Sequence, residues 1–195
     1  METVKQDYKI QFLTKMLGTV PKNKEVYTTY IATKGPEVNG DEEIKTVEEI
    51  EEKGWTGFHQ DEKGLFIYSY MILGFLKNAL QVLMENKTVK KVPAYKKWMD
   101  SMVFINPRRL YFNKDQPDGM IERPLRAMTA QGPRITVTRS DYIGEGQEIK
   151  FEVEVFRNSK GIDHELIEKL LEYGKYQGLG QWRGSGRYGQ FEVIK

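Results

Sequence analysis

The sequence alternates between charged and apolar side chains over residues 148–155, Glu148-Ile149-Lys150-Phe151-Glu152-Val153-Glu154-Val155. Successive side chains of a β-strand point to opposite faces, so this stretch predicts a strand with one buried and one solvated face. Antiparallel sheets commonly have one wet face, and we expect the Glu/Lys face to be only that. The stretch therefore indicates an antiparallel sheet, and the elements around it decide the topology.

A helix and a final strand follow this stretch. Asp163 can cap the helix at its N-terminus. An apolar stripe at helical spacing runs along it: Leu166, Ile167, Leu170 and Leu171. We expect the helix to end near Gly178 and a terminal strand to cover residues 191–194.

The chain before the alternating stretch supplies the other elements. Residues 8–13, 103–112 and 135–143 predict three strands, and residues 65–70 predict a short strand or extended lead-in to a helix over residues 71–85. The first strand has three apolar residues on one face: Tyr8, Ile10 and Phe12. The helix has its apolar residues at helical spacing: Ile72, Leu73, Leu76, Ala79, Leu80 and Leu83.

The coarse order strand, helix, strand, strand, helix, strand is the split βαβ order of a ferredoxin-like fold. We therefore predict one α+β, RRM-like domain over residues 1–195, with an antiparallel sheet and two helices on one face. Two excursions interrupt it. Residues 18–64 predict an acidic surface insertion with a short helix at 46–53, and residues 113–134 predict a basic loop with three prolines and two glycines.

The composition excludes several classes of protein. The 195 residues include no Cys, which excludes disulfides, iron–sulfur clusters, Cys-ligated zinc and thiol catalysis. The two His residues are far apart in the sequence, so we expect no metal site and no cofactor. The N-terminus lacks the apolar core of a signal peptide, and no apolar stretch is long enough to span a bilayer. We expect a cytoplasmic protein without membrane contact.

The net charge of +2 hides two segments of opposite charge. Residues 37–62 carry ten acidic and two basic residues, a net −8, whereas residues 87–139 carry twelve basic and four acidic residues, a net +8. Aromatic rings lie among the basic residues, a combination that suits a polyanion, although a solvated surface explains the same pattern. We expect the acidic segment to contact protein, because it would repel phosphate at close range.

Five of the 18 glycines fall within residues 178–189. Residues 184–189 match G-x-G-x-x-G, but a dinucleotide site needs this motif between a strand and a helix, and here a helix precedes it. Two arginines and two aromatic rings could instead grip a sugar-phosphate chain and stack on a base: Trp182, Arg183, Arg187 and Tyr188. Gly184 and Gly186 are expected at positive φ. The alternative is a tight helix-to-strand connection.

This ending resembles the C-terminal glycine-rich signature of the RAMP superfamily, the ferredoxin-like RNA-binding proteins of CRISPR effector complexes. The resemblance is carried by Leu170-Leu171, Gly178-Leu179-Gly180, Arg183-Gly184-Ser185-Gly186-Arg187-Tyr188-Gly189 and Phe191-Glu192-Val193. Residues 72–80 are similar to the family's first-helix pattern, in which a glycine is followed three residues later by a basic residue. Residues 146–153 are similar to its strand after a glycine. Leu73 stands where the family often has Lys, and we can place no catalytic Asp of the family.

The resemblance implies RNA binding near the glycine-rich loop and the first helix, and head-to-tail assembly with copies of itself or other subunits. Together with the basic segment it predicts these RNA contacts: Lys77, Asn78, Arg108, Arg109, Arg123, Arg126, Arg134, Arg139, Gly180, Trp182, Arg183, Gly184, Gly186, Arg187 and Tyr188. We expect single-stranded RNA as ligand, single-stranded DNA as the second candidate, and no cleavage.

Two alternatives stay open. One is an endoribonuclease that uses His59, expected in a loop beside Trp55 and Phe58, with a Tyr or Lys as its acid–base partner. The other is a viral protein-interaction module, such as a phage decoy or inhibitor of an antiviral nucleic-acid complex.

Overall fold

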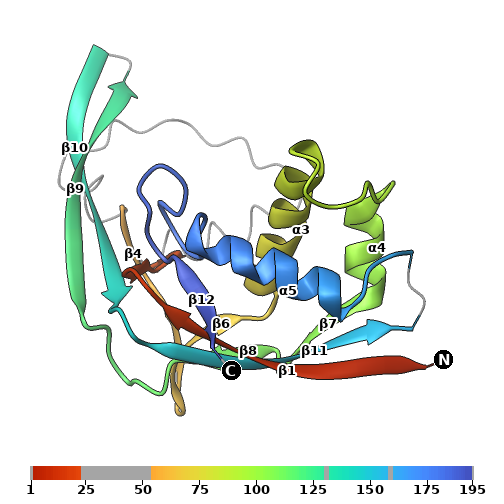
Figure 1. Cartoon of the computed structure of the whole chain (residues 1–195). Coiled ribbons are helices and arrows are strands. Elements are labelled where there is room, and N and C mark those ends of the chain that lie inside the picture. The colour runs from red at the N-terminus through yellow and green to blue at the C-terminus, as the bar shows by residue number, and fades with distance from the viewer. Residues whose placement is uncertain (1, 23–53, 130–131, 158–159, 195) are drawn as a thin grey trace, which may run out of the picture.

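The computed structural model describes residues 2–22, 54–129, 132–157 and 160–194 (Figure 1). The main sheet has the order β12-β1-β11-β7, with bounds β1 (Thr3–Phe12), β7 (Val103–Asn106), β11 (Glu148–Phe156) and β12 (Phe191–Ile194). All three neighbouring pairs are antiparallel. Helices α3 (Tyr70–Glu85) and α5 (His164–Glu172) lie on the same face of this sheet in Figure 1. The fold is the ferredoxin-like α+β fold that the sequence predicts.

The core lies between the main sheet and its helices. The alternating stretch forms β11, and its apolar residues are buried: Ile149, Phe151, Val153 and Val155. Tyr8 of β1 lies opposite Phe151, and Ile10 lies opposite Ile149. On the outer face Lys5 pairs with Glu152 at 3.2 Å, which confirms the solvated charged surface.

Helix α5 begins as predicted and ends earlier. The Asp163 carboxylate accepts a hydrogen bond from the Leu166 N–H at 2.8 Å, so it is the N-cap. The helix stops at Glu172 and continues as a single 3₁₀ turn, η1 (Tyr173–Lys175), instead of reaching Gly178. Gly174 lies directly against Phe191, since a Cβ there would be 2.4 Å from its ring. Because the helix ends early, Phe191, the first residue of β12, can pack against Gly174 of η1.

The basic excursion over residues 113–134 was predicted as a loop, and this is wrong. Residues Gly119–Thr129 form β9, which pairs along its whole length with β10 (Gly132–Ile143). Pro124 suggested a loop, but a strand with one partner tolerates a proline whose nitrogen faces away from the ladder. Figure 1 shows this hairpin extending away from the main sheet. At its base β10 also pairs with β2 (Met16–Leu17) and β4 (Trp55–Gly57), and β3 (Val20–Pro21) pairs with β4.

Residues 103–112, predicted as one strand, divide at Pro107 between two sheets. The first part is β7, and the second is β8 (Arg109–Tyr111), which pairs with β6 (Gly64–Tyr68). β5 (His59–Asp61) completes this three-stranded sheet, which we call sheet C.

Helix α4 (Tyr95–Met102) was not predicted, and it packs Met99 into the core. The helix predicted at 46–53 and most of the acidic insertion lie outside the described residues. No helix in the described ranges combines the length and apolar character that crossing a membrane requires.

Candidate nucleic-acid interface

The glycine-rich loop is closed at its base by backbone lying against backbone. The Leu179 N–H donates to the Gly189 carbonyl at 2.9 Å, and the Gly189 N–H donates to the Lys15 carbonyl at 2.8 Å. A Cβ on Gly178 would lie 2.1 Å from the Gly189 carbonyl carbon, and Gly189 itself has φ of +68°. Only glycine fits both positions, so these two residues form the neck of the loop.

The prediction of positive φ at Gly184 and Gly186 is wrong. Besides Gly189, the left-handed conformations belong to Gly180, with φ of +86°, and to Trp182 and Arg187, with φ of +56° each. A Cβ on Gly186 would lie 2.5 Å from the Trp182 carbonyl oxygen, so a close approach explains this glycine. A Cβ on Gly184 would meet nothing within 4 Å, and neither space nor φ requires glycine there.

One side chain fixes the loop to the base of the hairpin. The Gln181 amide oxygen accepts hydrogen bonds from the hydroxyls of Ser140 (3.0 Å) and Thr56 (3.2 Å), on β10 and β4. The Gln181 N–H donates to the Leu17 carbonyl of β2 at 3.3 Å. Ser140 is buried, so the hydrogen bond to Gln181 helps to satisfy its hydroxyl. The sequence contains no local signal that could have identified Gln181.

The hairpin brings a cation to the aromatic rings of the loop. The guanidinium carbon of Arg123, on β9, lies 4.1 Å from the ring centroid of Tyr188 and 4.9 Å from that of Trp182. Both rings are half-buried, and neither belongs to the hydrophobic core. Arg123 and the distant loop residues Trp182 and Tyr188, all predicted site residues, therefore form one cluster of a guanidinium and two rings.

Further cations surround this cluster. Arg183 and Arg187 are exposed, and neither forms an ion pair with any described residue. The Arg187 carbonyl accepts from the Thr14 hydroxyl at 3.0 Å, which fixes the backbone while leaving the side chain in solvent. Lys15, which the sequence did not single out, lies with its Nζ 4.5 Å from the Tyr142 ring centroid. Rings and exposed guanidinium groups side by side suit a nucleotide chain.

The remaining candidates belong to the hairpin and the first helix. Arg139 is paired with Glu122 across the hairpin at 2.8 Å. Arg126 is opposite Ile135 in the ladder, and Arg134 is opposite Ala127. On α3, the Lys77 ammonium is bound to Asp100 of α4 at 2.7 Å, and the neighbouring Asn78 is exposed.

The predicted basic segment is therefore not one surface. Its residues are divided among the α4 region, sheet C with Arg109 and the preceding Arg108, and the β9–β10 hairpin. Among its predicted contacts whose side chains are described, Arg123 is the one that touches the rings of the glycine-rich loop.

His59 lies on β5 and not in a loop. Its ring stacks on Phe66 at 5.4 Å and meets the edge of Tyr68 at 4.7 Å, whereas the predicted neighbours Trp55 and Phe58 pack elsewhere. Burial, with a smaller effect of the Arg109 charge, lowers the pKa of His59 and so favours the neutral imidazole. Within the described residues no three His, Asp or Glu side chains gather as metal ligands would.

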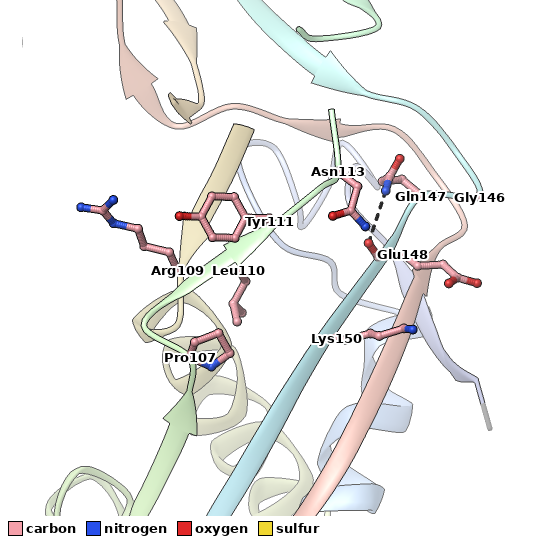
Figure 2. A pocket seen from close by; sticks show the side chains of 9 residues that line it. All are labelled: Pro107, Arg109, Leu110, Tyr111, Asn113, Gly146, Gln147, Glu148 and Lys150. Atoms are coloured by element: carbon pink, nitrogen blue, oxygen red, sulfur yellow. Dashed lines mark hydrogen bonds between the residues drawn. The ribbon is translucent and has the colours of Figure 1, made fainter. Parts of the chain in front are cut away.

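A cavity of about 400 Å³ opens between β8 and β11, lined by the nine residues that Figure 2 labels. Arg109 and Tyr111 extend to the side away from Gln147 and Glu148 in Figure 2. The Gln147 amide donates to the Glu148 carbonyl at 3.3 Å, and the Glu148 carboxylate pairs with Lys9 at 3.0 Å. Both signs of charge line this cavity, so it is less suited to phosphate than the glycine-rich loop.

No protein-family model matches the sequence, and no curated protein matches it. The fold is similar to that of a chain in the cryo-EM structure of the Type III-B Cmr-beta bound to cognate target RNA, with a TM-score of 0.53 and 13% sequence identity. The similarity covers 100% of this chain and 60% of that chain. At this identity it concerns the fold, and it is consistent with a RAMP-like architecture.

Proposed function

We propose that this chain is a non-catalytic, RAMP-like subunit that binds single-stranded RNA in a CRISPR-type complex. The observation that carries the proposal is the position of the Arg123 guanidinium against the rings of Trp182 and Tyr188, beside two exposed arginines. Aromatic faces stack on bases of any sequence, and guanidinium groups bind phosphate. The similar solved chain comes from an RNA-bound assembly, which supports RNA as the ligand.

In this proposal the glycine-rich loop binds the RNA. The neck of the loop and Gln181 fix the loop to the rest of the domain. RNA is the preferred ligand, and single-stranded DNA is the weaker one. The protein partners are other subunits of the complex or further copies of the chain, arranged head to tail along the RNA.

A salt series of fluorescence-anisotropy titrations with a labelled, unstructured RNA tests the proposal. Each phosphate contact on a single strand contributes about −0.7 to the slope of log affinity against log salt. We expect Arg183→Ala and Arg187→Ala each to weaken binding and to reduce the slope by about that amount. Arg157→Ala is the control. This exposed arginine directly follows the last residue of β11, it pairs with the exposed Glu2, and it is not among the predicted RNA contacts. Equal salt slopes in the unchanged protein and the three variants, or no RNA binding at low salt, would refute the proposal.

A further inference from the structure

A groove of about 560 Å³ lies between the second half of α3 and the start of α4. Its apolar lining comes from α3 and from the segment that leads into α4: Met84, Val92, Pro93, Ala94 and Tyr95. Val92 is buried, and its N–H donates to the Met84 sulfur at 3.2 Å. The Tyr95 hydroxyl donates to the side-chain oxygen of Gln81 at 2.8 Å. These contacts between the two helices hold the lining in place.

Lysines surround this groove. Residues 86–99 contain five lysines and no acidic residue, and all five lysines are exposed: Lys87, Lys90, Lys91, Lys96 and Lys97. Lys91 and Lys96 line the groove itself. One acidic residue, Glu85, also lines it, and its carboxylate accepts a hydrogen bond from the Gln81 amide at 3.0 Å. The groove therefore combines an apolar lining with a basic rim.

The aromatic rings beside these lysines are poorly placed to stack on a base. The Lys97 and Lys160 ammonium groups lie 5.3 Å and 5.4 Å from the Trp98 ring centroid, and Trp98 also packs against the core. Tyr95 packs against the core as well. Proteins that bind single strands combine cations with rings on which bases stack. Because this surface offers cations and an apolar groove, it fits an acidic protein segment with apolar anchors better than RNA.

The chain itself contains a segment with the complementary pattern. Val47 and Ile50 are three residues apart, so they share one face of the short helix that the sequence predicts over residues 46–53. Four glutamates lie among them: Glu48, Glu49, Glu51 and Glu52. An amphipathic helix that lays its apolar face into a groove is a recurring mode of protein recognition. The charges of this segment and of the groove are opposite.

The segment and the groove belong to opposite ends of the domain. Residues 46–53 lie between β3 and β4 in the chain, and these two strands pair with each other beside β10, at the base of the hairpin. Figure 1 shows α4 at the end of the main sheet away from this hairpin. A contact between two different surfaces joins copies head to tail, whereas a closed pair uses one surface twice.

We propose that the groove between α3 and α4 binds residues 46–53 of a second copy of this chain. Val47 and Ile50 pack against the apolar lining, and the glutamates lie beside the lysines of the rim. Exposed ion pairs contribute little individually, so burial of the apolar residues supplies most of the affinity and the charges supply the direction. The inference deepens the proposed function, in which further copies of the chain are partners, and it rests on that part of it.

Sedimentation equilibrium of the full chain without RNA, at low salt, measures the self-association. We expect the double variant Lys91→Glu/Lys96→Glu to weaken it about 10-fold to 100-fold, because each reversal replaces an attraction with a repulsion. Ile50→Ala should weaken it about 10-fold through lost apolar burial. The control Lys63→Glu/Lys150→Glu makes the same change in net charge at exposed lysines of the β5–β6 turn and of β11, and it should associate as the unchanged chain does.

A mixture of two variants tests the direction of the contact. Replacement of the four glutamates by lysine should also prevent self-association: Glu48→Lys, Glu49→Lys, Glu51→Lys and Glu52→Lys. Mixed with Lys91→Glu/Lys96→Glu, this protein should associate again, because each variant carries the surface that the other lacks. All of these changes affect charged side chains, and those of the groove are exposed, so folded protein is expected and circular dichroism checks it.

The outcomes separate this inference from RNA binding. An unchanged chain that stays monomeric at every concentration, or a mixture that fails to associate, would overturn the inference. If charge reversal in the groove alters thermal stability but not the mass, the segment binds the groove of its own chain and the inference is wrong. If Lys91→Glu/Lys96→Glu instead lowers RNA affinity and its salt slope with the mass unchanged, the groove binds RNA and the inference is also wrong. A loss of RNA binding in Arg187→Ala supports the proposed function whichever of these results is found.

Discussion

The neck of the glycine-rich loop offers a matched pair of identical substitutions, Gly178→Ala and Gly184→Ala. At Gly178 the new Cβ would lie 2.1 Å and 2.3 Å from the carbonyl carbon and oxygen of Gly189. Backbone atoms cannot rotate away as a flexible side chain can, so the two backbone segments that meet at the neck must move apart. At Gly184 the new Cβ meets nothing within 4 Å, and φ is not in the left-handed region.

The free-energy cost follows from what separation breaks. Overpacking costs about 1–3 kcal/mol, and each of the two hydrogen bonds at Gly189 contributes about 1 kcal/mol. We expect Gly178→Ala to lower the free energy of unfolding by about 3–5 kcal/mol, which for a chain of this size lowers Tm by roughly 6–20 °C. Gly184→Ala should range from neutral to about 1 kcal/mol more stable, because alanine restricts the unfolded chain.

Urea unfolding followed by circular dichroism measures both variants under one set of conditions. A common m-value would show that the change in midpoint reports stability. RNA affinity of the folded Gly178→Ala protein should fall, because the loop is no longer closed, whereas Gly184→Ala should bind as before. Equal stability of the two variants would refute the description of the neck.

Three further predictions concern the ligand and the partners. Trp182→Ala should weaken RNA binding about 5-fold to 150-fold with little change in salt slope, and a loss of thermal stability with unchanged affinity would show instead that Trp182 serves only the fold. Labelled RNA should stay intact with and without divalent metal ions, and cleavage that disappears in His59→Ala would establish the endoribonuclease. Reversal of four charges in the acidic segment should change association with protein and leave RNA affinity equal or higher, since the segment repels phosphate: Glu48, Glu49, Glu51 and Glu52. A folded charge-reversed protein with weaker RNA binding would contradict this assignment.

The elements that the sequence predicts well are those whose signal is local. The alternation over residues 148–155 and the apolar stripe of α5 report directly which side of each element is buried. Strand pairing is not local in this way. Pro124 argued against a strand at β9, and a strand accepts this proline because it lies at the edge of its sheet. The division at Pro107 depends on strand pairing in two different sheets, which the sequence does not reveal.

The same distinction applies to the candidate site. Trp182, Arg187 and Tyr188 could be singled out because they share a short glycine-rich loop. The contact of Arg123 with those rings depends on how the hairpin folds back, and the part that Gln181 plays depends on β4 and β10.

Photo-cross-linking to an RNA that carries 4-thiouridine, followed by mass spectrometry of the peptides, tests the central claim most directly. The claim is that the loop closed by Gly178 and Gly189 contacts RNA. We predict cross-linked peptides within residues 176–189, centred on Trp182 and Tyr188, and their loss at high salt as the phosphate contacts weaken. Cross-links confined to other parts of the chain, such as the lysines of α4, with none in this loop, would contradict the account.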